Sequence, residues 1–150
     1  PSAFHESDFA ETFAVNFAAP YELTQKAVAF FLKNDGGKVL MVGSRVGFKG
    51  EAGAAAYAAS KAALLNLVRS LSVEYADRNI GFFGIAPGWV QTAMSRDGMP
   101  DRLEAILETL PLGRMATPED CAASVAFLLS DEASYLSGQT IDINGASYFH

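Results

Sequence analysis

The chain has 150 residues, with one cysteine, Cys121, and two histidines, His5 and His150. A single cysteine cannot form an internal disulfide, which fits a reducing compartment. Because Cys121 lies among alanine and valine in a predicted helix, we expect a buried free thiol rather than a reactive one. The histidines lie near the two ends, without other ligand-type residues at metal-binding spacing. We therefore expect no metal site and structural or exposed histidines.

Basic residues and long apolar runs are also scarce. The chain has 11 Lys and Arg against 17 Asp and Glu, and its formal net charge is −6. The scattered basic residues form no patch that would neutralise phosphates, so we expect neither nucleic acid nor an anionic membrane as a partner. No signal peptide and no apolar run of about 18 residues is present, so we expect no membrane span and a cytoplasmic protein.

The order of apolar patterns and turn residues predicts an α/β fold. A helix over 7–32 is expected to be kinked at Pro20 or broken near Ala19. The further expected elements are a turn at 34–37, a strand at 38–43, a Gly-rich loop at 47–54, a helix at 55–77, a strand at 80–86, a loop, a helix at 118–129 capped by Thr117, and a strand at 139–143. Alternating strands and helices favour a parallel, doubly wound sheet within the single domain 1–150.

Tyr57 and Lys61 are the most informative pair of residues. They lie four residues apart in a stretch rich in alanine and leucine, and helical spacing places them on one face. A cation near a phenol favours its ionised form, so such a pair is suited to move a proton on and off an alcohol oxygen. Taken alone, the pair is also compatible with a surface lysine beside an amphipathic tyrosine.

Further motifs stand at defined places around this pair. Asn16 lies within the first predicted helix, and Ser44 follows the first predicted strand. Pro87-Gly88 and Thr92 follow the second strand, and Gly138-Gln139-Thr140-Ile141-Asp142-Ile143-Asn144-Gly145 covers the last. In this order and spacing the motifs closely resemble the short-chain dehydrogenase/reductase family, over the whole length of the chain.

The resemblance implies an NAD- or NADP-dependent oxidoreductase that interconverts a secondary alcohol and a ketone. Tyr57 would be the general acid and base, Lys61 would stabilise its phenolate and bind the nicotinamide ribose, and Ser44 would hydrogen-bond the substrate carbonyl. Asn16 would hold a water that links Lys61 to solvent. The nicotinamide would be lined by Pro87, Gly88, Val90 and Thr92. A 3-oxoacyl thioester, a sugar or polyol, and a steroid all remain open as substrates.

Two motifs of the family are absent from the 150 residues. These are the Gly-rich Thr-Gly-x-x-x-Gly-x-Gly turn that holds the cofactor pyrophosphate and the Asn-Asn-Ala-Gly that follows a later strand. The resemblance thus predicts an incomplete Rossmann-like sheet, the C-terminal catalytic portion of the family fold, and leaves NAD against NADP open. A cofactor-incompetent fragment or association module is the alternative function. The apolar edge at Val39–Val42 and the Ala-rich helix predict a covering partner: a missing N-terminal half, or a homodimer or homotetramer.

Some positions depart from the family pattern. Gly43 stands where a second serine is common, and Arg45 stands where small or apolar residues are more usual. Arg45 would either recognise an anionic group of the substrate or point to solvent, and we favour solvent. Tyr148 and Phe149 are extra aromatics that would cap a subunit interface or close over the substrate. Whether four apolar residues line the substrate pocket or simply pack is left open: Trp89, Met94, Met99 and Leu103.

Overall fold

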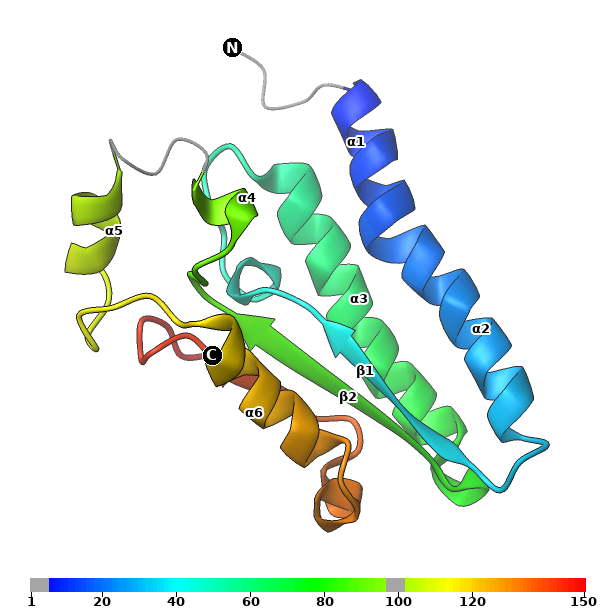
Figure 1. The fold of residues 1–150 in the computed structure, drawn as a ribbon. Coiled ribbons are helices and arrows are strands. Elements are labelled where there is room, and N and C mark those ends of the chain that lie inside the picture. Colours follow the sequence, from blue (N-terminus) through cyan, green and yellow to red (C-terminus); the bar gives the residue numbers. More distant parts are fainter. Residues whose placement is uncertain (1–5, 97–101) are drawn as a thin grey trace.

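A parallel sheet of three strands lies at the centre of the computed structural model, which describes residues 6–96 and 102–150. The strands are β1 (Gly37–Val42), β2 (Ile80–Pro87) and β3 (Thr140–Ile143), in the spatial order β1-β2-β3. Both neighbouring pairs are parallel, and helices connect the strands along the chain (Figure 1). The predicted α/β class with a parallel sheet is confirmed, and all three strands lie within one or two residues of their predicted bounds.

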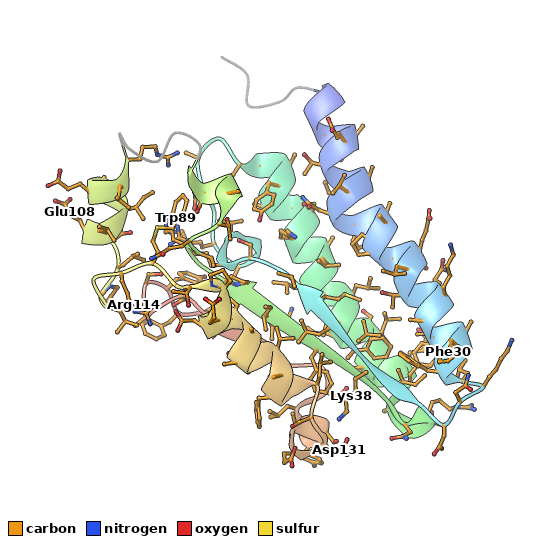
Figure 2. The ribbon with its side chains drawn as sticks, viewed as in Figure 1. Phe30, Lys38, Trp89, Glu108, Arg114 and Asp131 are labelled. Atoms are coloured by element: carbon orange, nitrogen blue, oxygen red, sulfur yellow. The ribbon has the colours of Figure 1, made fainter. Side chains whose placement is uncertain are left out.

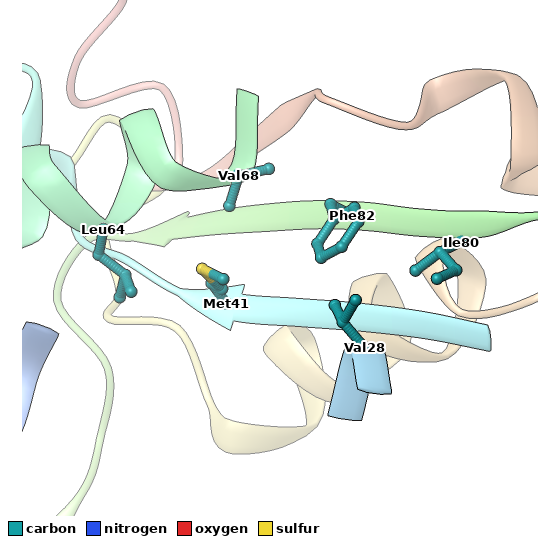
Figure 3. Close-up of a cluster of buried hydrophobic side chains, with 6 residues drawn as sticks. All are labelled: Val28, Met41, Leu64, Val68, Ile80 and Phe82. Carbon is teal, nitrogen blue, oxygen red and sulfur yellow. The ribbon is translucent and has the colours of Figure 1, made fainter. Parts of the chain in front are cut away.

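Hydrophobic clusters cover both faces of the sheet. On one face, α2 (Ala19–Phe31) and α3 (Ala55–Glu74) pack against β1 and β2 through a buried cluster (Figure 3), which consists of Val28, Met41, Leu64, Val68, Ile80 and Phe82. On the other face, α6 (Pro118–Leu128) and the 3-10 helix Asp131–Leu136 cover Phe83 and Ile85. Phe82 and Phe83 are adjacent and fully buried because successive strand residues point to opposite faces.

The first helical region is interrupted where the sequence predicts it. It consists of α1 (Glu6–Phe13), a π-helical turn (Ala14–Ala18) and α2. Pro20 has no N–H and its ring crowds the carbonyl four residues earlier, which belongs to Asn16. The chain accommodates this with a wider turn, in which the Ala19 N–H donates to the Ala14 carbonyl. Asn16 therefore lies in a π-helical turn, a local geometry that often occurs at functional sites.

Helix α3 is shorter than predicted. It ends at Glu74 rather than near residue 77, and a 3-10 turn (Ala76–Arg78) follows. Asn79 then adopts a left-handed φ of 54°, which an α-helix cannot continue through. This reversal brings the chain back to the start of β2. The local alanine-rich pattern did not reveal it.

Helix α6 begins as the sequence predicts. The Thr117 side chain accepts a hydrogen bond from the Asp120 N–H, and the Asp120 carboxylate accepts one from the Thr117 N–H, so both form a capping box. Pro118 occupies the first turn, where no N–H is needed.

Four short helices lie in segments where the sequence predicts a loop or no element. They are the 3-10 helix Arg45–Gly47 after β1, α4 (Ala93–Arg96) and α5 (Leu103–Glu108) after β2, and the 3-10 helix Asp131–Leu136 after α6. Helices of this length carry too little periodicity to be recognised from sequence. The first of them contributes Arg45 and Val46 to the lining of the candidate site.

The predicted open edge of the sheet is present. Among the described residues no strand pairs with β1 on the side away from β2, and Val42 is 52% exposed there. A groove of about 580 Å³ runs between this edge and α2. No helix within residues 6–96 and 102–150 is long and apolar enough to cross a membrane.

Candidate active site

A cavity of about 560 Å³ opens at the carboxyl ends of β1 and β2. Residues just after β1, residues at and after the end of β2, the first turns of α3 and part of α6 line it, so four separate segments meet there. In parallel α/β sheets this edge is where ligands bind. Its polar and charged lining residues are Ser44, Arg45, Glu51, Tyr57, Lys61, Thr92, Ser95 and Cys121.

Tyr57 and Lys61 lie together at the start of α3. The Lys61 Nζ is 5.7 Å from the centroid of the Tyr57 ring, and it donates a hydrogen bond to the Val42 carbonyl at 3.0 Å. Burial lowers the pKa of Lys61. Tyr57 is 39% exposed, so its phenol is open to a ligand in the cavity. The i,i+4 spacing therefore brings the two groups to one face of the helix, as the sequence predicts.

Ser44 follows β1 and begins the 3-10 helix Arg45–Gly47. Its backbone is extended, and its Oγ accepts a hydrogen bond from the Val46 N–H at 3.4 Å. A hydroxyl that accepts in this way keeps its own hydrogen free to donate.

Packing explains why residue 43 is a glycine rather than the serine that the family pattern has there. A Cβ on Gly43 would come within 2.4 Å of Leu65 Cδ2 in α3. The close approach of β1 to α3 leaves no room for a side chain there, and it brings Ser44 to the helix that carries Tyr57.

Asn16 does not line this cavity, but hydrogen bonds connect it to the helix that carries Tyr57 and Lys61. Its Nδ2 donates to Ser60 Oγ at 3.2 Å, and Ser60 Oγ donates to the Tyr57 carbonyl at 2.7 Å. Asn16 and Lys61 both line the groove beside β1. The structure thus places Asn16 next to the helical turn of Tyr57 and Lys61, but it does not line the cavity at Ser44.

The segment Pro87–Thr92 is fixed by neighbouring backbone. The Ala116 N–H donates to the Trp89 carbonyl, and the Gln91 N–H donates to the Ala116 carbonyl, each at 2.9 Å. In this parallel bridge the N–H and C=O of Val90 itself point away from Ala116. The predicted residues Pro87, Gly88, Val90 and Thr92 all line the cavity.

Arg45 does not point to solvent, and that prediction is wrong. Its side chain is only 10% exposed, its guanidinium carbon lies 5.6 Å from the centroid of the Trp89 ring, and its Nη2 lies 3.5 Å from Glu51 Oε2. Figure 2 shows Trp89 beyond the carboxyl end of β2, where this contact forms. Contacts from two separate loops bury the guanidinium, which the local sequence around Arg45 could not indicate.

Cys121 differs from expectation. It is only partly buried and lines the cavity, although burial raises the pKa of its thiol.

The sequence leaves open whether four apolar residues line the pocket. Of these, Trp89 lines the cavity, and Leu103 is 39% exposed. Met99 lies outside the described residues, as does the side chain of Met94. Glu51 and Ser95 were not identified from sequence, because a lone acid or serine in a loop carries no spacing signal.

The C-terminal aromatics pack near the loop that follows Ser44. His150 stacks on Phe48 with 3.8 Å between ring centroids and pairs with Asp142 at 3.1 Å. The Tyr148 hydroxyl donates to the Phe48 carbonyl at 3.3 Å. His150 is exposed and packs on Phe48, so the expectation of a structural or exposed histidine is confirmed for it, whereas His5 lies outside the described residues. Phe149 is 78% exposed and does not close over the cavity.

Comparisons with known proteins agree with this geometry. A family model described as enoyl-(acyl carrier protein) reductase matches residues 2–146. The 3-oxoacyl-[acyl-carrier-protein] reductase FabG of Rickettsia felis is 40% identical over 93% of this chain and 58% of its own length, and that of Salmonella typhimurium is 39% identical over 95% and 57%. The chain thus spans little more than half of these relatives. A crystal structure described as an NAD(P)-dependent gluconate 5-dehydrogenase from Beutenbergia cavernae, with NADP at low occupancy, superposes with a TM-score of 0.92 at 35% identity, over 96% of this chain and 59% of that one.

Proposed function

The chain belongs to the short-chain dehydrogenase/reductase family, and on that premise we propose that it carries the reaction centre of an NAD(P)-dependent oxidoreductase. The proposed reaction interconverts a secondary alcohol and a ketone. One observation carries the proposal: Ser44, Tyr57 and Lys61 line a single cavity together with Pro87–Thr92. That cavity combines a proton donor, a cation and a hydroxyl in a space suited to a small molecule.

The residues around the cavity fit a nicotinamide. The Val90 N–H and C=O point away from the bridge to Ala116, and the Thr92 hydroxyl accepts from the Ser95 N–H and keeps its hydrogen. These groups would hold the carboxamide. Lys61 has ammonium hydrogens beyond the one given to Val42, and they would hold the ribose hydroxyls. The cofactor supplies the hydride for reduction, or accepts it in the reverse direction.

The proton transfer involves three residues with different roles, Tyr57, Ser44 and Lys61. In reduction, Tyr57 gives its phenolic proton to the carbonyl oxygen, which becomes the alcohol oxygen. Ser44 donates a hydrogen bond to that oxygen and stabilises the negative charge that develops on it. Lys61, close to the Tyr57 ring, stabilises the phenolate that remains. In oxidation the same phenolate takes the proton back.

Asn16 lies outside the cavity, next to the helical turn that carries Tyr57 and Lys61. Its side chain lies beside Ser60, and it lines the same groove as Lys61. We assign to it the positioning of a water that passes protons between Lys61 and solvent. Lys61 lines this groove as well as the cavity, so a water held beside Asn16 would give its ammonium a route to solvent that ligands in the cavity leave open.

The relatives support an oxidoreductase but point to different substrates. Two are named as reductases of 3-oxoacyl groups on a carrier protein, and the similar structure is described as a dehydrogenase of a sugar acid. A 3-oxoacyl or related ketone is our proposed substrate class. Side chains at the substrate end of the cavity must decide among such ketones.

The experiment is a turnover assay with a matched pair of variants. The purified chain is titrated with NADH and NADPH by nicotinamide fluorescence, and oxidation of the reduced cofactor is then followed with ethyl acetoacetate. Tyr57→Phe should lower kcat by about 10²- to 10⁴-fold, the usual contribution of a general acid. Tyr135→Phe is the control, because Tyr135 is fully exposed and does not line the cavity.

One result of the cofactor titration would refute the proposal for these residues. If the folded chain binds neither NADH nor NADPH, the alternative function, an association module, is favoured. Such a role has some support in the apolar side chains exposed on α2 and α3, of which Leu23 is 68% and Val73 is 80% exposed. We propose that these surfaces mediate self-association, which the oligomeric state in solution tests.

A further inference from the structure

Arg45 is a buried cation beside the proposed reaction centre. It directly follows Ser44 in the chain, lines the same cavity as Tyr57, and has a side chain that is 10% exposed. Removing a guanidinium from water costs several kcal/mol unless good partners compensate it. What Arg45 contacts therefore shows whether its role is structural or ligand-binding.

The contacts of Arg45 leave its hydrogen-bonding capacity largely unused. Its carboxylate neighbour Glu51 lies at 3.5 Å, well beyond the 2.7–2.9 Å typical of a charge-assisted hydrogen bond. The other contact is the face of Trp89, which uses no N–H. Among the described residues, no hydrogen bond from the guanidinium is formed, although it carries five N–H donors in a planar fork. In the same part of the chain, no guanidinium nitrogen is both buried and without a partner, so these donors face the cavity rather than packed protein.

The charge balance in the cavity favours an anion. Among residues 6–96 and 102–150, the charged residues that line it are two cations, Arg45 and Lys61, and one acid, Glu51. The whole chain carries a net charge of −6, so the cavity is locally positive within an acidic protein. A cleft lined by an excess of positive charge raises the local concentration of negatively charged ligands.

We infer that Arg45 selects substrates that carry a carboxylate near the ketone, and that Glu51 is the counter-ion this carboxylate displaces. The inference rests on the proposed function, because it names the substrate class of the same site. The planar fork of Arg45 matches a carboxylate with two parallel hydrogen bonds. Small keto acids are then preferred over neutral esters of the same skeleton.

Acetoacetate and ethyl acetoacetate test this preference, because both present the same ketone and only the acid carries a charge. The quantity compared is the ratio of kcat/KM for the acid to kcat/KM for the ester. Arg45→Met should lower this ratio by about 10- to 100-fold, mainly through KM, as expected for a lost charged hydrogen bond. Arg102→Met is the matched control: its guanidinium also lies near Trp89, at 6.0 Å, but Arg102 is exposed and does not line the cavity.

Glu51→Gln separates the ligand-binding role from a structural one. If the carboxylate of the substrate displaces Glu51, removing that competing charge should lower the KM for acetoacetate by about 2- to 5-fold. If Arg45 and Glu51 are only a structural pair, the variant should weaken the turnover of acid and ester together. Equal losses for acid and ester, in either variant, overturn the inference.

Trp89 gives a readout that does not depend on hydride transfer. It is the one tryptophan of the chain and contacts Arg45, so its fluorescence reports on this end of the cavity. Acetoacetate should change it saturably in the wild type and not in Arg45→Met. No change in the wild type, or the same change in Arg45→Met, refutes the carboxylate site. Absence of turnover together with a saturable fluorescence change refutes the proposed function but supports the anion site.

Discussion

Gly43→Ala should be among the most destabilising single-methyl additions in this chain. An added Cβ would lie 2.4 Å from Leu65 Cδ2 and 2.8 Å from Leu65 Cγ. Leu65 is 1% exposed, so neighbouring atoms enclose the side chain that the new methyl group would meet. The Gly43 backbone cannot retreat either, because its N–H donates to the Ile85 carbonyl at 2.8 Å. Overpacking of this kind costs about 1–3 kcal/mol of unfolding free energy.

A double-mutant cycle identifies the cause. Leu65→Ala alone should cost about 2–5 kcal/mol, because it leaves a cavity beneath β1. In the double variant the new methyl group of residue 43 occupies part of that cavity. The combined loss should therefore be smaller than the sum of the single losses, by about 1–3 kcal/mol.

Denaturant unfolding followed by circular dichroism measures these free energies. Gly50→Ala is the control, since an added Cβ there meets no atom within 4 Å. The reasoning fails if Gly43→Ala is as stable as Gly50→Ala. It also fails if the losses of Gly43→Ala and Leu65→Ala are additive to within about 0.5 kcal/mol.

Three further predictions concern groups around the fold. Thr117→Ala removes the cap of α6 and should cost about 1 kcal/mol in denaturant unfolding; an unchanged midpoint would contradict the capping role. The Arg114 guanidinium holds the pKa of Asp120 well below its usual range, so the stability that this pair contributes is present above about pH 4 and is lost as pH falls below it. Asp120→Asn should flatten that decline in acid unfolding, and an unchanged acid limb would refute the assignment. Ser60→Ala leaves Asn16 Nδ2 without its acceptor and should cost about 1–2 kcal/mol, whereas a neutral effect would show that the bond is dispensable.

Much of the fold can be predicted from the sequence because the patterns that indicate it involve residues close together in the chain. The apolar strands, the Thr117 cap and the i,i+4 pair Tyr57 and Lys61 depend on residues close together in the chain, and the structure contains all of them. The irregular turn before α2 was located through Pro20, although its π-helical form was not. That form depends on how the neighbouring backbone rearranges its hydrogen bonds once Pro20 has no N–H to donate to the Asn16 carbonyl.

Features made by distant contacts were not accessible from sequence. Arg45 is buried by Trp89 and Glu51, which belong to other loops, and no local pattern encodes that meeting. The end of α3 depends on the left-handed conformation of Asn79. Cys121 reaches the cavity only because α6 packs against the end of the sheet. The oligomeric state and the cellular compartment stay predictions.

A single-turnover experiment tests the central claim most directly, because it separates chemistry from binding and product release. The chain is mixed with NADPH, ketone is added in excess, and the first oxidation of bound NADPH is followed in the wild type and in Tyr57→Phe. The account predicts that both proteins bind NADPH and that the rate falls by about 10²- to 10⁴-fold in the variant. A rate within about 3-fold of the wild type would contradict proton transfer at Tyr57.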